Sequence, residues 1–145
     1  MAMEDRLTEA GVNRRCVLLV AESDDFLDGI ASWLLKAPGL EVVGRAHSGH
    51  EAMDRVERLS PDLVLMDISL ADMNGFEVTR RIKSQRPAPF VLLMTFHDSR
   101  VVGLAAMEAG ADGCVSKTEV TDRLLPAIDA LLGFPGQPPR MPDDK

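Results

Sequence analysis

Five short apolar runs, separated by longer amphipathic segments, constrain the fold of this chain more than any other feature of its sequence. The runs are Cys16–Val20, Leu40–Val43, Leu63–Met66, Phe90–Met94 and Gly113–Val115. They are rich in Val and Leu, as expected of parallel strands that are buried on both faces. The alternation of strand-length and helix-length segments therefore predicts an α/β fold, in which helices cover both faces of a parallel sheet.

The segments between the runs carry apolar residues at the spacing of amphipathic helices. These residues are Phe26, Ile30, Trp33 and Leu34, then Met53, Val56 and Leu59, then Phe76, Thr79 and Ile82, then Val102, Ala105, Ala106 and Ala109. We expect them to form core rather than to take part in chemistry. A fifth helix is predicted from about Thr121 to Leu132, with Pro126 near its first turn, where a missing amide hydrogen costs little.

Length and composition indicate one domain. The chain has 145 residues, of which 46% are hydrophobic, and this suffices for a single core. We place the domain at residues 15–132, between a flexible N-terminal segment, 1–14, and a proline-rich tail or linker, 133–145. No signal peptide or bilayer-length apolar stretch is recognisable, which favours a cytoplasmic location.

The charge and the cysteines exclude several classes of function. Sixteen Lys+Arg and twenty-three Asp+Glu give a formal net charge of -7, which opposes direct nucleic-acid binding by this chain. Cys16 and Cys114 show neither metal-ligand spacing nor a disulfide framework, so we expect reduced thiols. The three histidines show no zinc spacing.

Polar residues with complementary chemistry follow four of the apolar runs. Glu22 follows the first run, Asp67 the third, Thr95 the fourth and Lys117 the fifth. In an open parallel sheet, ligands bind beyond the carboxyl ends of the strands, so we expect these side chains to converge at one edge.

These residue types suit phosphoryl transfer. Two carboxylates offer the hard oxygen ligands that Mg²⁺ takes in proteins. A lysine ammonium and a threonine hydroxyl can each bind a phosphoryl oxygen. An aspartate can act as a nucleophile that forms an acyl phosphate, and Asp67 is our candidate for this role.

Three stretches carry a family resemblance: LVLMDISLADMNGFE, VLLMTF and AGADGCVSK resemble the signature segments of response-regulator receiver domains. The resemblance covers roughly Arg15 to Leu132. It implies a flavodoxin-like, doubly wound sheet of five parallel strands in the order 2-1-3-4-5, with five helices. It also implies that Asp67 is phosphorylated, that Thr95 and Lys117 read the new charge, and that Glu22, Asp67 and the backbone carbonyl of Ser69 bind Mg²⁺.

The resemblance also implies partners in two-component signalling. A sensor histidine kinase would dock near the first helix, Phe26–Leu35, and donate the phosphoryl group. The switched surface would comprise the fourth helix, the fifth strand and the fifth helix, through which a homodimer is expected. Thr118, where the family frequently has proline, associates the chain with regulators that carry a LuxR-type helix-turn-helix output domain.

Three positions depart from the family pattern. Ala21 stands where the family has the first of two adjacent acids, so we expect weakened Mg²⁺ binding. Nearby Asp24 and Asp25 can substitute as ligands, but aspartate at a helix entrance favours an N-cap. Cys114 replaces a frequent aromatic residue, and we expect it to pack in the sheet. Phe96 replaces a small residue beside Thr95, and its ring would narrow the path to Asp67 or join a different switch.

Two other functions remain as alternatives. One is a phosphate-independent receiver that acts as a protein-interaction module, which Ala21 and Cys114 would favour. The other is an enzyme with an external substrate, such as a flavodoxin-like reductase. The chain lacks a phosphate-binding glycine loop and has no tyrosine and only one tryptophan, so we place this alternative last.

Overall fold

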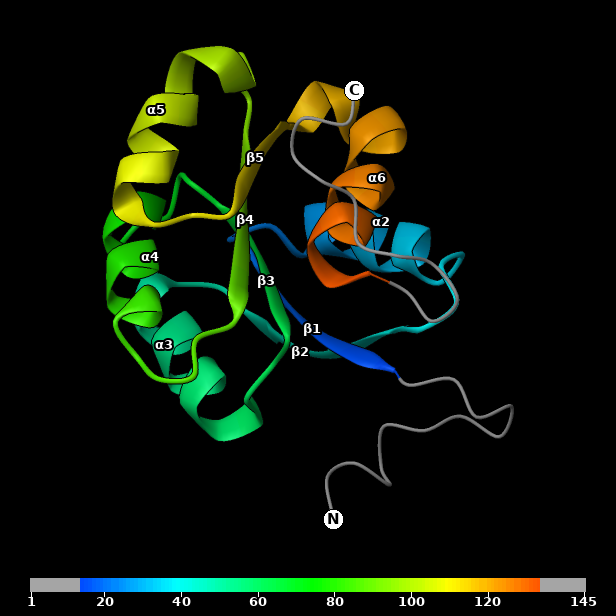
Figure 1. Ribbon diagram of the computed structural model, residues 1–145, viewed down its shortest axis with the longest axis horizontal. Coiled ribbons are helices and arrows are strands. Elements are labelled where there is room, and N and C mark those ends of the chain that lie inside the picture. Colours follow the sequence, from blue (N-terminus) through cyan, green and yellow to red (C-terminus); the bar gives the residue numbers. More distant parts are fainter. Residues whose placement is uncertain (1–13, 134–145) are drawn as a thin grey trace.

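The computed structural model describes residues 14–133 and shows one twisted sheet with helices on both faces (Figure 1). The strands are β1 (Arg15–Val20), β2 (Leu40–Ala46), β3 (Leu63–Asp67), β4 (Phe90–Thr95) and β5 (Gly113–Ser116). The helices are α2 (Asp24–Leu34), α3 (Gly49–Leu59), α4 (Gly75–Lys83), α5 (Ser99–Ala109) and α6 (Val120–Leu132), and the 3₁₀ turn η1 (Lys117–Glu119) precedes α6.

The five strands are parallel and lie in the order β2-β1-β3-β4-β5. This confirms the predicted flavodoxin-like arrangement and places β3 at the centre of the sheet. The predicted terminal segments, 1–14 and 133–145, lie almost entirely outside the described residues.

The sheet separates two apolar layers. Alternate residues of β1, including Val17 and Leu19, pack with α2 and α6, whereas Leu18 and Val20 pack with α3, α4 and α5. Figure 1 shows the same division, with α2 and α6 on one side of the strands and the other three helices opposite. Burial on both faces explains why the strands read as uninterrupted apolar runs.

The helices that border the carboxyl edge of the sheet begin at polar caps. Ser23, Ser48, Asn74 and Asp98 cap α2, α3, α4 and α5 respectively, and each side chain accepts a hydrogen bond from a backbone N–H in the first turn. The N-cap role expected for Asp24 or Asp25 is therefore wrong, because Ser23 fills it. Asp24 instead contacts Arg45, near the end of β2, and His47, directly after that strand.

Most residues expected on the core faces of the helices are buried or pack against the core, with a few exceptions. In α2 the deepest positions are Leu27, Ile30 and Leu34, while Phe26 is only partly buried. Leu59 is 37% exposed and Ala105 is also exposed, so these two residues are not core.

Pro126 is the seventh residue of α6 rather than part of its first turn. The prediction that it lies near the first turn was therefore wrong, because the helix starts at Val120 and one turn spans only about 3.6 residues. The interior position removes one backbone donor, and the buried residues Leu124, Ile128 and Leu132 anchor the helix on the sheet around it.

Cys16 and Cys114 form no disulfide with each other. Cys16 is on β1 and Cys114 on β5, and β3 and β4 lie between those strands. Partial burial raises the pKa of the Cys114 thiol, which keeps it in its unreactive neutral form. Within residues 14–133, no helix combines the length and apolar character that crossing a bilayer requires.

Candidate functional site

The carboxyl edge of the central strand holds a buried ion pair. Asp67, the last residue of β3, is 8% exposed. Its Oδ2 accepts a hydrogen bond from Nζ of Lys117 at 2.5 Å, and its Oδ1 accepts one from the backbone N–H of Ser69 at 3.0 Å. Both carboxylate oxygens therefore have charged or polar partners, which offset the cost of burying the charge.

Two aromatic rings flank the ammonium group of Lys117. Its Nζ lies 4.3 Å from the ring centroid of Phe96 and 4.6 Å from that of Phe26. A cation within about 6 Å of a ring centroid is attracted by the ring's negative face. The two rings and Asp67 thus leave the Lys117 side chain only 8% exposed.

Thr95 lies at the end of β4, beside this pair. The sheet register pairs Thr95 with Ser116, the residue before Lys117. Thr95 is 4% exposed, and its Oγ1 accepts a hydrogen bond from the backbone N–H of His97 at 3.0 Å. The hydroxyl predicted to read a phosphoryl group is thus at the site and fixes the start of the β4–α5 loop.

The first strand brings Glu22 to the same edge. Val20 pairs with Met66, so the buried Ala21 follows at the level of Asp67 and the exposed Glu22 lies one residue farther out. The structure therefore joins Asp67, Lys117 and Ser69 by direct contacts. It leaves Glu22 exposed to solvent at the adjacent strand end.

The oxygen atoms available at this edge of the sheet fit a partial magnesium site. The carboxylates of Asp67 and Glu22 and the carbonyl of Ser69 are hard oxygen ligands, and Mg²⁺ commonly combines one or two carboxylates with water and phosphate oxygens. Among the described residues, no cluster of three or more His, Cys, Asp or Glu side chains is arranged to hold a metal ion. Ala21, whose side chain has no ligand atom, occupies the position level with Asp67.

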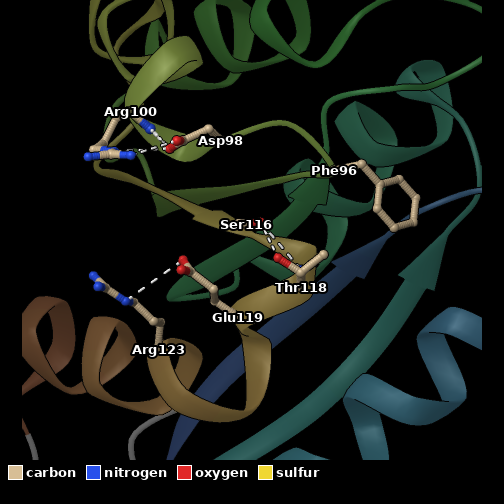
Figure 2. A pocket seen from close by; sticks show the side chains of 7 residues that line it. All are labelled: Phe96, Asp98, Arg100, Ser116, Thr118, Glu119 and Arg123. Carbon is tan, nitrogen blue, oxygen red and sulfur yellow. Dashed lines mark hydrogen bonds and ion pairs between the residues drawn. The ribbon is translucent and has the colours of Figure 1, made fainter.

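Phe96 is also one of the residues that line a pocket of about 440 Å³. Figure 2 shows the ion pairs Asp98–Arg100 and Glu119–Arg123 on its wall, and the facing hydroxyls of Ser116 and Thr118. The lining residues are Phe96, Asp98, Arg100, Ser116, Thr118, Glu119 and Arg123. They come from the β4–α5 loop, α5, β5, η1 and α6, so the pocket lies on the face that these elements share.

Sequence reasoning missed two features of the site. Phe26 packs against the core as predicted, but its ring also contacts the ammonium of Lys117, which helical spacing does not report. Asp72, on the loop after β3, was given no role, although its carboxylate reaches the first residues of α3. No spacing in the sequence links Asp72 to Gly49 or His50, so sequence reasoning had no signal for this contact.

Comparison with known proteins identifies the family. The response regulator receiver domain family matches residues 17–129. The protein-glutamate methylesterase/protein-glutamine glutaminase of Agrobacterium fabrum is 38% identical over 102 residues, which are 69% of this chain and 29% of that protein. The response regulator protein VraR of Staphylococcus aureus is 37% identical over 113 residues, which are 77% of this chain and 54% of VraR. The chain thus spans about half or less of these relatives.

A solved structure agrees with the sequence comparisons. The crystal structure of a LuxR-family two-component response regulator from Aurantimonas sp. SI85-9A1 matches with a TM-score of 0.77 at 32% identity, and the match covers 81% of this chain and 84% of that one. The family match, the strand order and the solved structure all indicate the same type of domain. This chain therefore belongs to the response regulator receiver domain family.

Proposed function

We propose that residues 15–132 form a phosphorylation-dependent switch in which Asp67 accepts a phosphoryl group from a sensor histidine kinase. Receiver domains interact with such kinases. The observation that carries the proposal is the buried pair of Asp67 and Lys117 at the end of the central strand. An acid in this position can act as nucleophile, and the adjacent lysine can bind the charge that the acid acquires, which supports the proposal.

The transfer forms a bond between a carboxylate oxygen of Asp67 and phosphorus, and breaks the bond between phosphorus and the donor's histidine nitrogen. The histidine leaves and keeps the electron pair of the broken bond. Mg²⁺, when bound near Glu22, Asp67 and the Ser69 carbonyl, neutralises charge on the phosphoryl oxygens. In this proposal the chain promotes its own phosphorylation and dephosphorylation, and has no external substrate.

Lys117 and Thr95 connect the site to the face formed by α5, β5 and α6. Lys117 directly follows β5 and contacts Phe96, which also lines the pocket on that face. Phosphorylation of Asp67 gives Lys117 and the Thr95 hydroxyl a new partner. Their movement would release Phe96 and the β4–α5 loop, and so change the packing of the face.

The same face is our candidate for self-association. Val101, Leu104 and Met107 are 74%, 68% and 72% exposed along α5, the helix that also supplies Arg100 to the pocket. A protein partner, either a second copy or an attached output domain, fits this surface better than DNA does, because the chain carries a net charge of -7. The proposal also includes a cytoplasmic location for this protein.

A phosphoryl mimic tests this function. Beryllium fluoride with Mg²⁺ should bind Asp67 and shift the amide NMR signals of Ser69, Thr95 and Phe96, together with those of α5, β5 and α6. Asp67→Asn should abolish the shifts. Unchanged spectra for the intact, folded protein would contradict the switch and favour a phosphate-independent interaction module.

A further inference from the structure

The loop that follows Asp67 is tied to a helix that carries none of the expected site residues. Both carboxylate oxygens of Asp72 are used: Oδ1 accepts from the backbone N–H of Gly49 at 2.8 Å, and Oδ2 from that of His50 at 3.0 Å. Nδ1 of the His50 ring lies 2.7 Å from the same Oδ2. Asp72 thereby binds the first two residues of α3 across 22 or more positions of sequence.

These contacts satisfy a specific need of the helix. The first N–H groups of an α-helix have no partner within the helix. Ser48 accepts only a later one, from Glu51, and Asp72 accepts the two that remain at Gly49 and His50. The negative carboxylate is also favoured by the positive end of the helix dipole. These backbone hydrogen bonds hold the pKa of Asp72 well below its usual range.

Apolar packing reinforces the junction. A Cβ atom at position 49 would overlap the side chain of Met73 and lie 2.8 Å from Cγ2 of Val78. Gly49 is itself buried, so α3 approaches the loop as closely as its backbone allows. The loop is therefore held against α3 both by Asp72 and by its neighbour Met73.

The ends of the loop are fixed by other contacts. The N–H of Ile68 donates to the carbonyl of Met94 at 3.0 Å, and that of Gly75 donates to the carbonyl of Ile68 at 2.7 Å. The N–H of Ser69 donates to Oδ1 of Asp67. Asp72 joins the middle of the loop to the rest of the molecule, and so limits how far Ser69 can move from Asp67.

We propose that Asp72 is a positioning residue for the reaction at Asp67: by clamping the loop to the N-terminus of α3, it holds the Ser69 backbone against the reacting carboxylate. His50 supplies the third contact of this clamp. The inference rests on the proposed function. It extends that function to a residue and a helix outside the set expected to bind phosphate or metal.

The kinetic test uses acetyl phosphate, which transfers its phosphoryl group to the carboxylate of Asp67 as acetate leaves. Asp72→Ala should slow labelling roughly 10-fold, because small displacements of positioning groups have large effects on rate. Asp72→Asn keeps one oxygen acceptor and should recover part of the rate. Asp54→Ala is the matched control, since it removes an exposed acid from the surface of α3 and should leave the rate unchanged.

The His50 contact is tested by a rescue. His50→Ala should slow labelling about 2–3-fold, a smaller effect than at Asp72 because both backbone hydrogen bonds persist. His50→Asn places an amide nitrogen near the position of Nδ1 and should restore the rate. Equal labelling rates for His50→Ala and His50→Asn would show that the His50 side chain does not help Asp72 to position the loop.

Hydrogen exchange separates positioning from general loss of structure and needs no phosphoryl donor. In Asp72→Ala the amides of Gly49, His50 and Ser69 should exchange at least 10-fold faster, while those of β1 and β3 keep their protection. Faster exchange throughout the protein, or wild-type labelling and wild-type Ser69 exchange, would overturn the inference. If the wild type itself is not labelled, the proposed function fails, and the exchange of Ser69 still decides whether Asp72 holds the loop.

Discussion

Lys117 and Asp67 are separated by fifty positions of sequence, yet Nζ of the lysine lies 2.5 Å from Oδ2 of the aspartate. Their side chains are 8% and 11% exposed. The parallel sheet produces this contact, because it brings the carboxyl ends of β3 and β5 to one edge. The pairing of these two charges therefore depends on strand order. A substitution at one residue should change the contribution of the other to stability.

A double-mutant cycle should detect this coupling. Asp67→Asn or Lys117→Met alone leaves a buried polar partner unmatched, whereas the double variant removes both charges. The free energies of unfolding, measured in urea, should therefore show a coupling of about 1–3 kcal/mol. The exposed pair Asp54–Arg58 is the control, for which we expect less than about 0.5 kcal/mol. Additive effects at Asp67 and Lys117 would contradict the assigned contact.

Phe96 should control access to Asp67 more than it controls stability. The residue is 73% exposed, but its ring lies over the ammonium of Lys117. Phe96→Leu should change the unfolding free energy by less than about 1 kcal/mol. It should also speed both labelling by acetyl phosphate and loss of the phosphoryl group. Phe90→Leu, at the opposite end of β4, should leave both rates unchanged. Equal rates for Phe96→Leu and the wild type would argue against a shielding role.

Gly75, the first residue of α4, should not tolerate a side chain. A Cβ atom would lie 2.8 Å from Cα of Ile68 and 3.1 Å from the carbonyl oxygen of Asp67, and backbone atoms cannot easily move aside. Gly75→Ala should lower the free energy of unfolding by about 1–3 kcal/mol. Gly103 in α5 meets nothing within 4 Å, so Gly103→Ala should raise it by about 0.5–1 kcal/mol. Thermal or urea unfolding compares the two, and the same sign for both would refute this difference in packing.

His47 should titrate above its usual range. A hydrogen bond from its ring to Asp24 raises the pKa of His47 above 6.5. Because the folded-state pKa is the higher one, the pair stabilises the fold fully below the unfolded pKa. That stabilisation is lost as the pH rises through the folded pKa. NMR titration of the His47 ring should show the raised value, and Asp24→Asn should lower it. An unchanged pKa in that variant would exclude Asp24 as the cause.

The fold was predictable because buried parallel strands leave a clear pattern. Leu63–Met66 and Phe90–Met94 are apolar without interruption, since both faces of β3 and β4 are covered. The bounds of the edge strand β2 were harder to predict. This strand extends to Ala46, but Glu41 and Arg45 interrupt its apolar run, because one side of an edge strand meets solvent. In α2, Ile30 and Leu34 are buried as predicted. Of the adjacent apolar pair, Leu27 rather than Phe26 is the deeper residue, and sequence alone does not decide between the two.

The site was predictable only where topology determines position. The positions of Asp67, Thr95 and Lys117 could be predicted, because each lies at or just after the carboxyl end of a parallel strand. The aromatic contacts of Lys117 depend on side-chain direction, which periodicity does not report. The reach of Asp72 to Gly49 depends on how a loop packs against a distant helix, and the sequence shows no spacing that links the two residues.

Intact-mass analysis after incubation with acetyl phosphate and Mg²⁺ tests the central claim most directly. We predict a gain of about 80 Da, one phosphoryl group, that disappears in Asp67→Asn and in the presence of a chelator. Wild type and Asp67→Asn should show equal secondary structure, so that loss of labelling reports the lost nucleophile. Labelling that persists in Asp67→Asn, or no labelling of folded wild type by acetyl phosphate or by a cognate kinase, would contradict the assignment of Asp67 as the phosphoacceptor.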